Sequence, residues 1–156
     1  MVRRQLTICF SFLIISFVGL GTAKGQSQES EKQKVTAEKK PSNFTGTVEV
    51  KMFTQANNPL NCSVGSVSFQ PGARTNWHKH AGGQILLITD GIAFYQERGG
   101  VKKILNKGEL VSCPPNVEHW HGASTNGAMT HLAVGPNTDK GPVTWLEKVE
   151  EHVYLK

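Results

Sequence analysis

Short apolar and β-branched runs, separated by glycine, proline and asparagine, fill the sequence from Phe44 to the C-terminus. Such runs are typical of strands joined by turns, and no long stretch has the 3.6-residue period of a helix, although Glu147–Tyr154 fits a single helical turn. A sheet of about nine short strands leaves the fewest unpaired edges when it closes into a sandwich or barrel. The pattern predicts one all-β domain over residues 44–156, a closed sandwich or barrel. The predicted strands are Thr45–Phe53, Cys62–Phe69, Ile85–Thr89, Ile92–Glu97, Val101–Leu105, Leu110–Ser112, Val117–His121, Met129–Val134 and Val143–Val149.

Segments rich in glycine and proline mark the connections between these runs. Asp90-Gly91 and Gly99-Gly100 are typical of tight hairpin turns, whose residues must accept positive φ angles. Pro71-Gly72, Asn106–Gly108 and Pro114–Asn116 indicate corners. We therefore expect a hairpin on either side of the strand that lies between the first two turns.

The first 25 residues have the three parts of a secretory signal peptide. Arg3 and Arg4 form a short basic region, Leu6–Leu20 is mostly apolar, and Ala23 and Gly25 are small residues suited to cleavage. An apolar run of about 15 residues is shorter than the ~20 needed to span a bilayer, which favours cleavage over an uncleaved membrane anchor. We expect a mature protein that is periplasmic or secreted and not bound to a membrane.

The net charge of +5 is concentrated near the N-terminus. Residues 1–25 hold three basic residues and no acidic one, whereas from Phe44 onward ten Lys and Arg stand against nine Asp and Glu. No basic stripe for a nucleic acid remains in the domain, so we expect no nucleic-acid partner. Residues 26–43 are polar and bury too little apolar surface to fold alone, which predicts a disordered linker.

Export affects the interpretation of the cysteines, because disulfides form in oxidising compartments. Cys62 and Cys113 remain after cleavage, and they could form a disulfide or stay as two free thiols on separate strands. Neither lies in a CxxC motif or beside an obvious base, so thiol catalysis is not expected.

The first candidate for chemistry is the His-x-His pair formed by His78 and His80. Alternate side chains of a strand point to the same face, so both imidazoles can reach one metal ion. Gln84 follows after Ala81–Gly83, and its amide oxygen is a plausible neutral ligand once the chain has turned back.

A second pair, His119 and His121, repeats the alternation, and His131 lies ten residues beyond it. One such pair is often only two strand histidines bonded to solvent or backbone, but two pairs in one small β-domain favour a metal site. Imidazole is the usual ligand of Zn, Fe, Mn and Cu. His152 lies in a charged C-terminal segment, and we assign it no role.

Several neighbours of these histidines point the other way along the strands. Trp77 and Trp120 alternate with the histidines, which predicts packing in the core or at an interface. Lys79 alternates in the same manner and is expected in solvent. Arg74 shares the parity of the first pair and either reaches the pocket or lies at a solvated corner.

The pattern resembles the two sequence motifs of the cupins. The first motif is matched at the family's intervals, with glutamine replacing the usual glutamate, by Gly72, His78, His80, Gln84 and Gly91. The second motif is matched by Gly108, Pro114 and His119, and Asn116 and Ala123 depart from it. The resemblance implies a double-stranded β-helix, a single jelly-roll barrel of the kind that encloses a ligand.

A narrower likeness covers most of the domain. The segments that look like manganese-dependent cupin hydroxynitrile lyases and carboxymuconolactone-decarboxylase-like cupins are Phe44–Val48, Pro71–His80, Gly83-Gln84, His119–Ala123 and Met129–Ala133. This resemblance implies a divalent metal, manganese first, with Fe, Zn, Ni or Cu as alternatives. The implied ligands are His78, His80, Gln84 and His119, and the implied catalytic residues beside them are His121 and His131.

Four neutral ligands leave a divalent ion with its whole +2 charge, which favours Lewis-acid chemistry. A nearby histidine with an ordinary pKa of ~6.5 could accept a substrate proton at neutral pH. We therefore predict a lyase that cleaves a C–C bond next to a hydroxyl in a small molecule, as a hydroxynitrile lyase does. A metal-dependent dioxygenase and a non-enzymatic small-molecule binder are the alternatives. Exposed sheet edges further predict a homo-oligomer.

Overall fold

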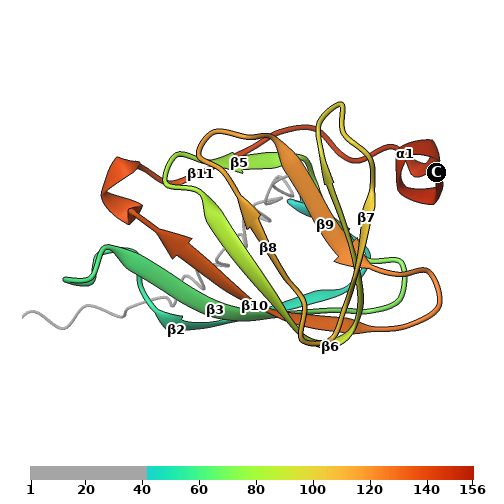
Figure 1. Ribbon diagram of the computed structural model, residues 1–156, viewed down its shortest axis with the longest axis horizontal. Coiled ribbons are helices and arrows are strands. Elements are labelled where there is room, and N and C mark those ends of the chain that lie inside the picture. The colour runs from blue at the N-terminus through green and yellow to red at the C-terminus, as the bar shows by residue number, and fades with distance from the viewer. Residues whose placement is uncertain (1–41) are drawn as a thin grey trace, which may run out of the picture. The chain divides into compact units, whose positions relative to one another are not determined.

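The structure is a computed structural model that describes residues 42–156 (Figure 1). The predicted signal peptide, residues 1–25, lies outside the described residues, as does nearly all of the predicted linker, residues 26–43. Within residues 42–156 no helix is long and apolar enough to cross a membrane.

The described chain is almost entirely β-structure, which confirms the all-β prediction. A 3-10 helix (Thr138–Lys140) and a short helix α1 (Glu151–Leu155) are its helical elements. The strands are β1 (Phe44–Thr45), β2 (Val48–Thr54), β3 (Cys62–Phe69), β4 (Arg74–Thr75), β5 (His78–His80), β6 (Gln84–Glu97), β7 (Lys103–Asn106), β8 (Leu110–Cys113), β9 (His119–Ala123), β10 (Met129–Pro136) and β11 (Val143–Trp145).

The strands pair antiparallel and form two sheets that curve into a nearly closed barrel (Figure 1). One sheet contains β1, β4, β5, β7, β9 and β11, and the other contains β2, β3, β8 and β10. The long strand β6 belongs to both, because its first half pairs with β8 and β10 and its second half with β7 and β9. This strand therefore joins the two walls of the barrel.

The predicted hairpin at Asp90-Gly91 is wrong, because β6 passes through these residues without reversing. Gly91 has a φ of 73°, and a Cβ there would lie 2.1 Å from the carbonyl oxygen of Ala128. The adjacent strand β10 shifts register opposite this bend. The glycine allows close approach where β6 passes from one sheet into the other, and the local signal for a tight turn also fits such a corner. The Gly99-Gly100 turn joins β6 to β7 as predicted.

Other predicted boundaries also shift. The predicted strand Thr45–Phe53 is divided into β1 and β2 at Gly46, whose φ is 78° and whose backbone lies against Ala73. The predicted strand Val143–Val149 ends early, at β11, and the helical turn predicted for Glu147–Tyr154 is observed slightly later, as α1.

Two apolar clusters flank the sheet that contains β9. Phe69 and Ile88 belong to the cluster inside the barrel. Trp77, Trp120 and Tyr154 form a second cluster with the C-terminal segment, which confirms the packing role predicted for both tryptophans. Because side chains alternate along β9, the histidines on either side of Trp120 face the interior instead.

Candidate metal centre

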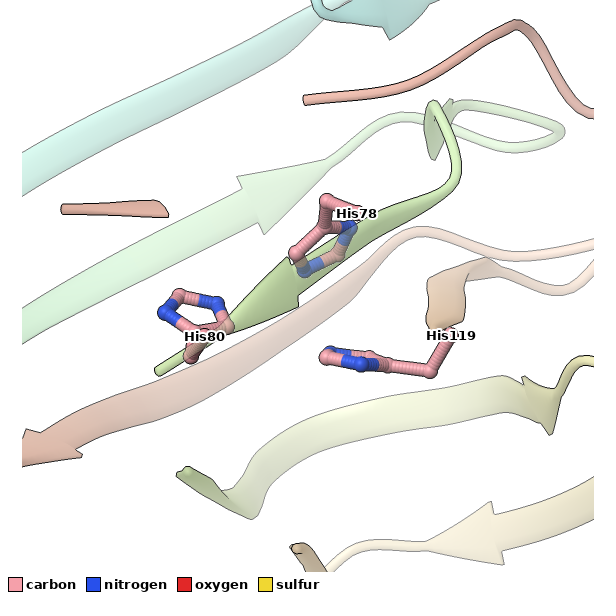
Figure 2. A group of neighbouring side chains, drawn as sticks. All are labelled: His78, His80 and His119. Carbon is pink, nitrogen blue, oxygen red and sulfur yellow. The ribbon is translucent and has the colours of Figure 1, made fainter. Parts of the chain in front are cut away.

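Three histidines from two neighbouring strands converge inside the barrel (Figure 2). His78 and His80 lie on β5, and His119 lies on β9 directly opposite His78. One ring nitrogen from each of the three lies within 4.8 Å of the others. The alternation of a strand therefore places the first pair on one face, and antiparallel pairing brings the third ring to it, as the spacing of the histidines predicts.

Gln84 joins this group from the first position of β6. Its side chain is buried, and its Oε1 atom lies 2.9 Å from Nε2 of His119. The turn before it is tight, since a Cβ on Gly82 would lie 2.1 Å from the carbonyl oxygen of Pro136 and Gly83 has a φ of 85°. The two glycines thus return the chain so that the amide faces the imidazoles.

Backbone carbonyls orient two of the rings. Nδ1 of His78 lies 3.0 Å from the carbonyl oxygen of Asn76, and Nδ1 of His119 lies 3.0 Å from that of Val117. A carbonyl only accepts, so Nδ1 of His78 carries the proton and its Nε2 keeps its lone pair. His119 faces an acceptor oxygen at each ring nitrogen, and with its proton on Nδ1 the lone pair of Nε2 lies against Oε1 of Gln84, an arrangement that a shared cation would stabilise. Nε2 of His80 is buried and has no hydrogen-bond partner among residues 42–156.

The rings of the cluster are held in their neutral form. Burial lowers the pKa of His80 to about 4, with the neighbouring His119 acting in the same direction. Burial also lowers the pKa of His119 and, more strongly, that of His78, whose two neighbouring histidines add to the effect. Neutral imidazoles and an amide oxygen present free lone pairs at one point, which is the donor set that a divalent metal requires. The residues therefore fit a metal.

A second histidine pair lies beside the cluster. Nε2 of His131 lies 3.2 Å from Nδ1 of His121, and the ring of His121 is centred 5.2 Å from that of His78. Phe69 packs against both members of the pair. The structure thus brings the two predicted catalytic residues next to the predicted ligands.

The pKa values of both histidines in this pair differ from the ordinary value of ~6.5 that was expected from the sequence. Burial lowers the pKa of His131 to about 4. Burial, followed by the nearby His131, lowers the pKa of His121 well below its usual range. Both rings are therefore neutral at pH 7, and each would be a stronger acid than an ordinary imidazolium once protonated.

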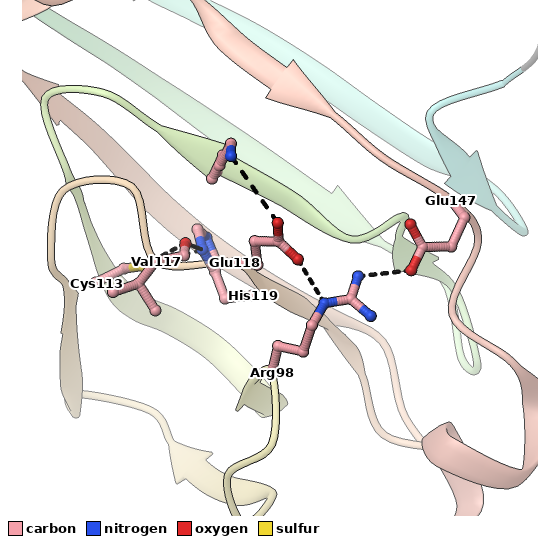
Figure 3. Close-up of polar contacts among 7 residues, drawn as sticks. Arg98, Cys113, Val117, Glu118, His119 and Glu147 are labelled. Atoms are coloured by element: carbon pink, nitrogen blue, oxygen red, sulfur yellow. Dashed lines mark hydrogen bonds and ion pairs between the residues drawn. The ribbon is translucent and has the colours of Figure 1, made fainter.

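Cys113 contacts the cluster, a position that the sequence pattern did not predict (Figure 3). Its Sγ lies 2.9 Å from Nδ1 of His119, on the side of the ring away from Gln84. Burial raises the pKa of the thiol, which favours the neutral form. Cys62 and Cys113 are both free, so the alternative of two unpaired thiols is the one observed.

The cluster opens into a cavity of about 240 Å³. Its walls are mostly apolar, and the ring of Trp145 lies 4.8 Å from that of His78 and 5.6 Å from that of Phe44. Sequence reasoning missed both aromatic residues, because nothing local shows that β1 and β11 meet at the mouth of the barrel. A larger cavity of about 510 Å³, which includes His152, lies between the β6–β7 turn and α1 and contains none of the predicted ligands.

Charged side chains support the ligand strands from outside. Lys79 lies 3.9 Å from Glu118, and Arg98 forms ion pairs with Glu118 and Glu147 (Figure 3). Lys79 therefore points away from the cluster, as predicted.

Arg74 is neither in the pocket nor at a solvated corner. It is buried, its guanidinium lies 2.7 Å from the carboxylate of Glu151, and it packs over the ring of Tyr154. Both alternatives predicted for it are wrong, because the C-terminal helix covers this position, and a distant segment of that kind leaves no local signal.

The chain is similar to known proteins in sequence and fold. Residues 65–135 match the model of the cupin domain. Over 113 residues the chain is 42% identical to an (R)-mandelonitrile lyase from Granulicella tundricola, covering 72% of this chain and 86% of that protein. The crystal structure of a cupin-like protein from Thermotoga maritima is 49% identical, with a TM-score of 0.70, and the match covers 71% of this chain and 84% of that one. A DMSP lyase from Ruegeria pomeroyi, 16% identical with a TM-score of 0.58 over 67% of this chain and 54% of that one, shares the fold alone.

Proposed function

The chain belongs to the cupin domain family, in its hydroxynitrile-lyase-like subgroup, and from this premise we propose that it is a metal-dependent lyase. Membership also confirms the predicted double-stranded β-helix. The observation that carries the proposal is the placement of a neutral histidine pair beside three histidines and a glutamine in one apolar cavity. We propose cleavage of a C–C bond next to a hydroxyl, with a 2-hydroxynitrile as the first substrate class to test.

The group implied by this family is a divalent metal, and we propose manganese as the first candidate, before Fe, Zn, Ni or Cu. His78, His80, Gln84 and His119 would hold it. When bound, it supplies a Lewis acid whose charge is not reduced by its neutral ligands.

The histidine pair would move the proton. His121 is the member next to the cluster, and its neutral ring accepts the substrate's hydroxyl proton. The oxygen then forms a carbonyl as the bond to the nitrile carbon breaks, and the electron pair of that bond leaves on cyanide. Because burial makes protonated His121 a stronger acid than an ordinary imidazolium, it readily returns the proton to cyanide and regains its neutral form.

His131 would act as a positioning residue. Its Nε2 would accept a hydrogen bond from Nδ1 of His121, which leaves Nε2 of His121 as the basic atom and holds that ring toward the cluster. The apolar walls formed by Phe44 and Trp145 would receive the organic part of the substrate, and the small cavity favours a substrate with one ring at most.

We further propose that residues 1–25 direct export and that the mature protein works in the periplasm or outside the cell. The sequence supports this through its basic, apolar and small-residue regions. Mass analysis of the isolated protein tests it, since a chain that begins near Gln26 is expected and an intact N-terminus would contradict it.

The test of the lyase proposal compares the protein with His80→Ala and, as a matched control, His152→Ala. We expect one metal per chain by elemental analysis after manganese reconstitution, with mandelonitrile cleavage. Both should be lost in His80→Ala and kept in His152→Ala, because only the first removes a member of the cluster. Metal without cleavage would reject the lyase and direct the search to oxygen uptake or simple binding. Absence of stoichiometric metal would reject the metal centre itself.

A further inference from the structure

A row of polar side chains leads away from His119 on the side of its ring that faces away from Gln84. Sγ of Cys113 lies 2.9 Å from Nδ1 of His119, and Tyr95 packs with Cys113 in one cluster. The Tyr95 hydroxyl donates a hydrogen bond of 3.1 Å to Oε1 of Glu97. Cys113, Tyr95 and Glu97 do not line the cavity, so this row lies outside the space that is open to a substrate.

Strand pairing fixes the positions of these residues. Glu97 lies opposite His119 where β6 pairs with β9. Cys113 lies opposite Gln84 where β8 pairs with β6. Tyr95 and Glu97 occupy alternate positions of β6, so their side chains share a face, and the buried ring of Tyr95 is centred 5.6 Å from that of His119. The same barrel strands therefore hold both the proposed ligands and the row behind them.

His119 donates a proton toward the thiol. With its proton on Nδ1, the ring shares that N–H between the carbonyl oxygen of Val117, at 3.0 Å, and Sγ of Cys113 (Figure 3). The sulfur accepts this hydrogen bond through a lone pair. The S–H proton of Cys113 is therefore free to point to another acceptor.

The Tyr95 oxygen is the acceptor best suited to the thiol proton. The carbonyl oxygens of Val117 and Pro114 are also within reach of Sγ, at 3.6 and 3.7 Å. The Tyr95 oxygen, however, gives its own proton to Glu97 and receives no other hydrogen bond from residues 42–156. Burial raises the pKa of Tyr95, and its hydrogen bond with Cys113 adds to this effect. The donors then run in one direction, from the imidazole through the thiol and the hydroxyl to the carboxylate.

Glu97 places a negative charge at the end of this row, whereas the proposed ligands are all neutral. Burial lowers the pKa of His119, and the Val117 carbonyl and the charge of Glu97 partly oppose this effect. Hydrogen bonds in a row polarise one another. A carboxylate at the far end therefore draws the N–H proton of His119 outward and makes its Nε2 a stronger electron donor.

We propose that Tyr95 and Glu97 are positioning residues of the metal centre, which act on His119 through the thiol of Cys113 and strengthen its bond to a divalent cation. The inference rests on the metal centre of the proposed function and does not depend on the reaction performed there. Its consequence is that a carboxylate that touches neither the cation nor the substrate helps to set the metal affinity of the site.

Infrared spectroscopy of the metal-free protein tests the row itself. The S–H stretching band of Cys113 is identified as the one that is missing from Cys113→Ala. It should move to higher wavenumber in Tyr95→Phe, because the S–H bond is stronger once the thiol loses its acceptor. Tyr154→Phe removes a buried hydroxyl that donates to Ala123, and it should leave the band in place. An unmoved band in Tyr95→Phe would overturn the proposal.

Manganese affinity, measured by chelator competition, tests what the row does. Tyr95→Phe and Glu97→Gln should each raise the dissociation constant about tenfold, the lower end of the effect expected for an outer partner of a metal ligand. Because both changes interrupt one row, the double variant should also lose about tenfold and not about a hundredfold. Glu109→Gln removes a carboxylate that is hydrogen-bonded to Asn106, and it should bind manganese like the wild type.

Unchanged circular dichroism would show that the variants fold, and Glu97→Gln, at a half-buried position, provides the test if Tyr95→Phe does not fold. Single variants that bind manganese as tightly as the wild type would overturn the proposal, as would a double variant that loses about a hundredfold. A wild type without affinity for manganese would reject the metal centre and, with it, the role of the row. None of these results involves turnover, so failure of the lyase proposal is distinct from them.

Discussion

The buried neutral state of His131 predicts a specific loss of stability in acid. Its pKa is about 4 in the folded protein, against ~6.5 in an unfolded chain. As the pH falls through 6.5, the unfolded chain takes up a proton that the folded protein does not, so the stability present above this pH is lost progressively down to the folded pKa. Between pH 7 and pH 5 this one group should lower the free energy of unfolding by about 2 kcal/mol.

The replacement His131→Gln removes the titrating group and keeps a polar side chain of similar size. Urea unfolding of metal-free protein at both pH values should show that the variant loses at least about 2 kcal/mol less than the wild type on acidification. This difference between the wild type and the variant should not be smaller than about 2 kcal/mol. His131 also lowers the pKa of His121, so removing His131 reduces the stability that His121 loses in acid as well.

The control for this comparison is His152→Gln, which changes an exposed histidine outside the cluster. It should lose as much stability as the wild type between the two pH values. Equal losses in the wild type and His131→Gln would refute the reasoning, because they would mean that His131 is protonated equally in the folded and unfolded states. The buried neutral state assigned to His131 would then have no support.

Three further predictions follow from contacts around the barrel. Cys113→Ala should weaken manganese binding by about tenfold to a hundredfold in a chelator competition, because the thiol supports His119, whereas Cys62→Ala should not. Gly91→Ala should lower the free energy of unfolding by about 3 kcal/mol or more, because strain and overlap add. In the same urea titration Gly108→Ala, with positive φ but open space, should cost only about 1–2 kcal/mol. Trp145→Ala should raise the KM for mandelonitrile more than it lowers kcat, because this ring forms cavity wall.

The sequence predicts the cluster well because its geometry follows from strand periodicity. Two alternating histidines on one strand must share a face, and the second pair repeats the rule on the adjacent strand. The resemblance to cupins adds Gln84, whose place depends on a tight glycine turn. In each case a short local pattern contains the information, and the structure brings these residues together.

The remaining features depend on contacts between distant segments. Cys113 reaches His119 through the packing of β8 against β6, and Trp145 reaches His78 because β11 pairs with β5. The glycine at 91 looks like a hairpin residue, yet it serves a close approach to Ala128. The lowered histidine pKa values arise from burial, which a sequence pattern does not measure.

The strands that hold the histidine cluster are different from the strands that form the cavity mouth. His119 and His121 occupy alternate positions of β9, so the distance from the proposed ligand to the proposed base is set by the pleat of one strand. Their supports, β5, β6 and β10, are paired strands of the barrel. The cavity mouth is built instead from short or marginal elements, β1, β2 and β11, which contribute apolar side chains but no member of the cluster. If the proposed lyase reaction is correct, substitutions at the mouth should therefore alter substrate preference while leaving metal affinity and the His121–His131 pair intact.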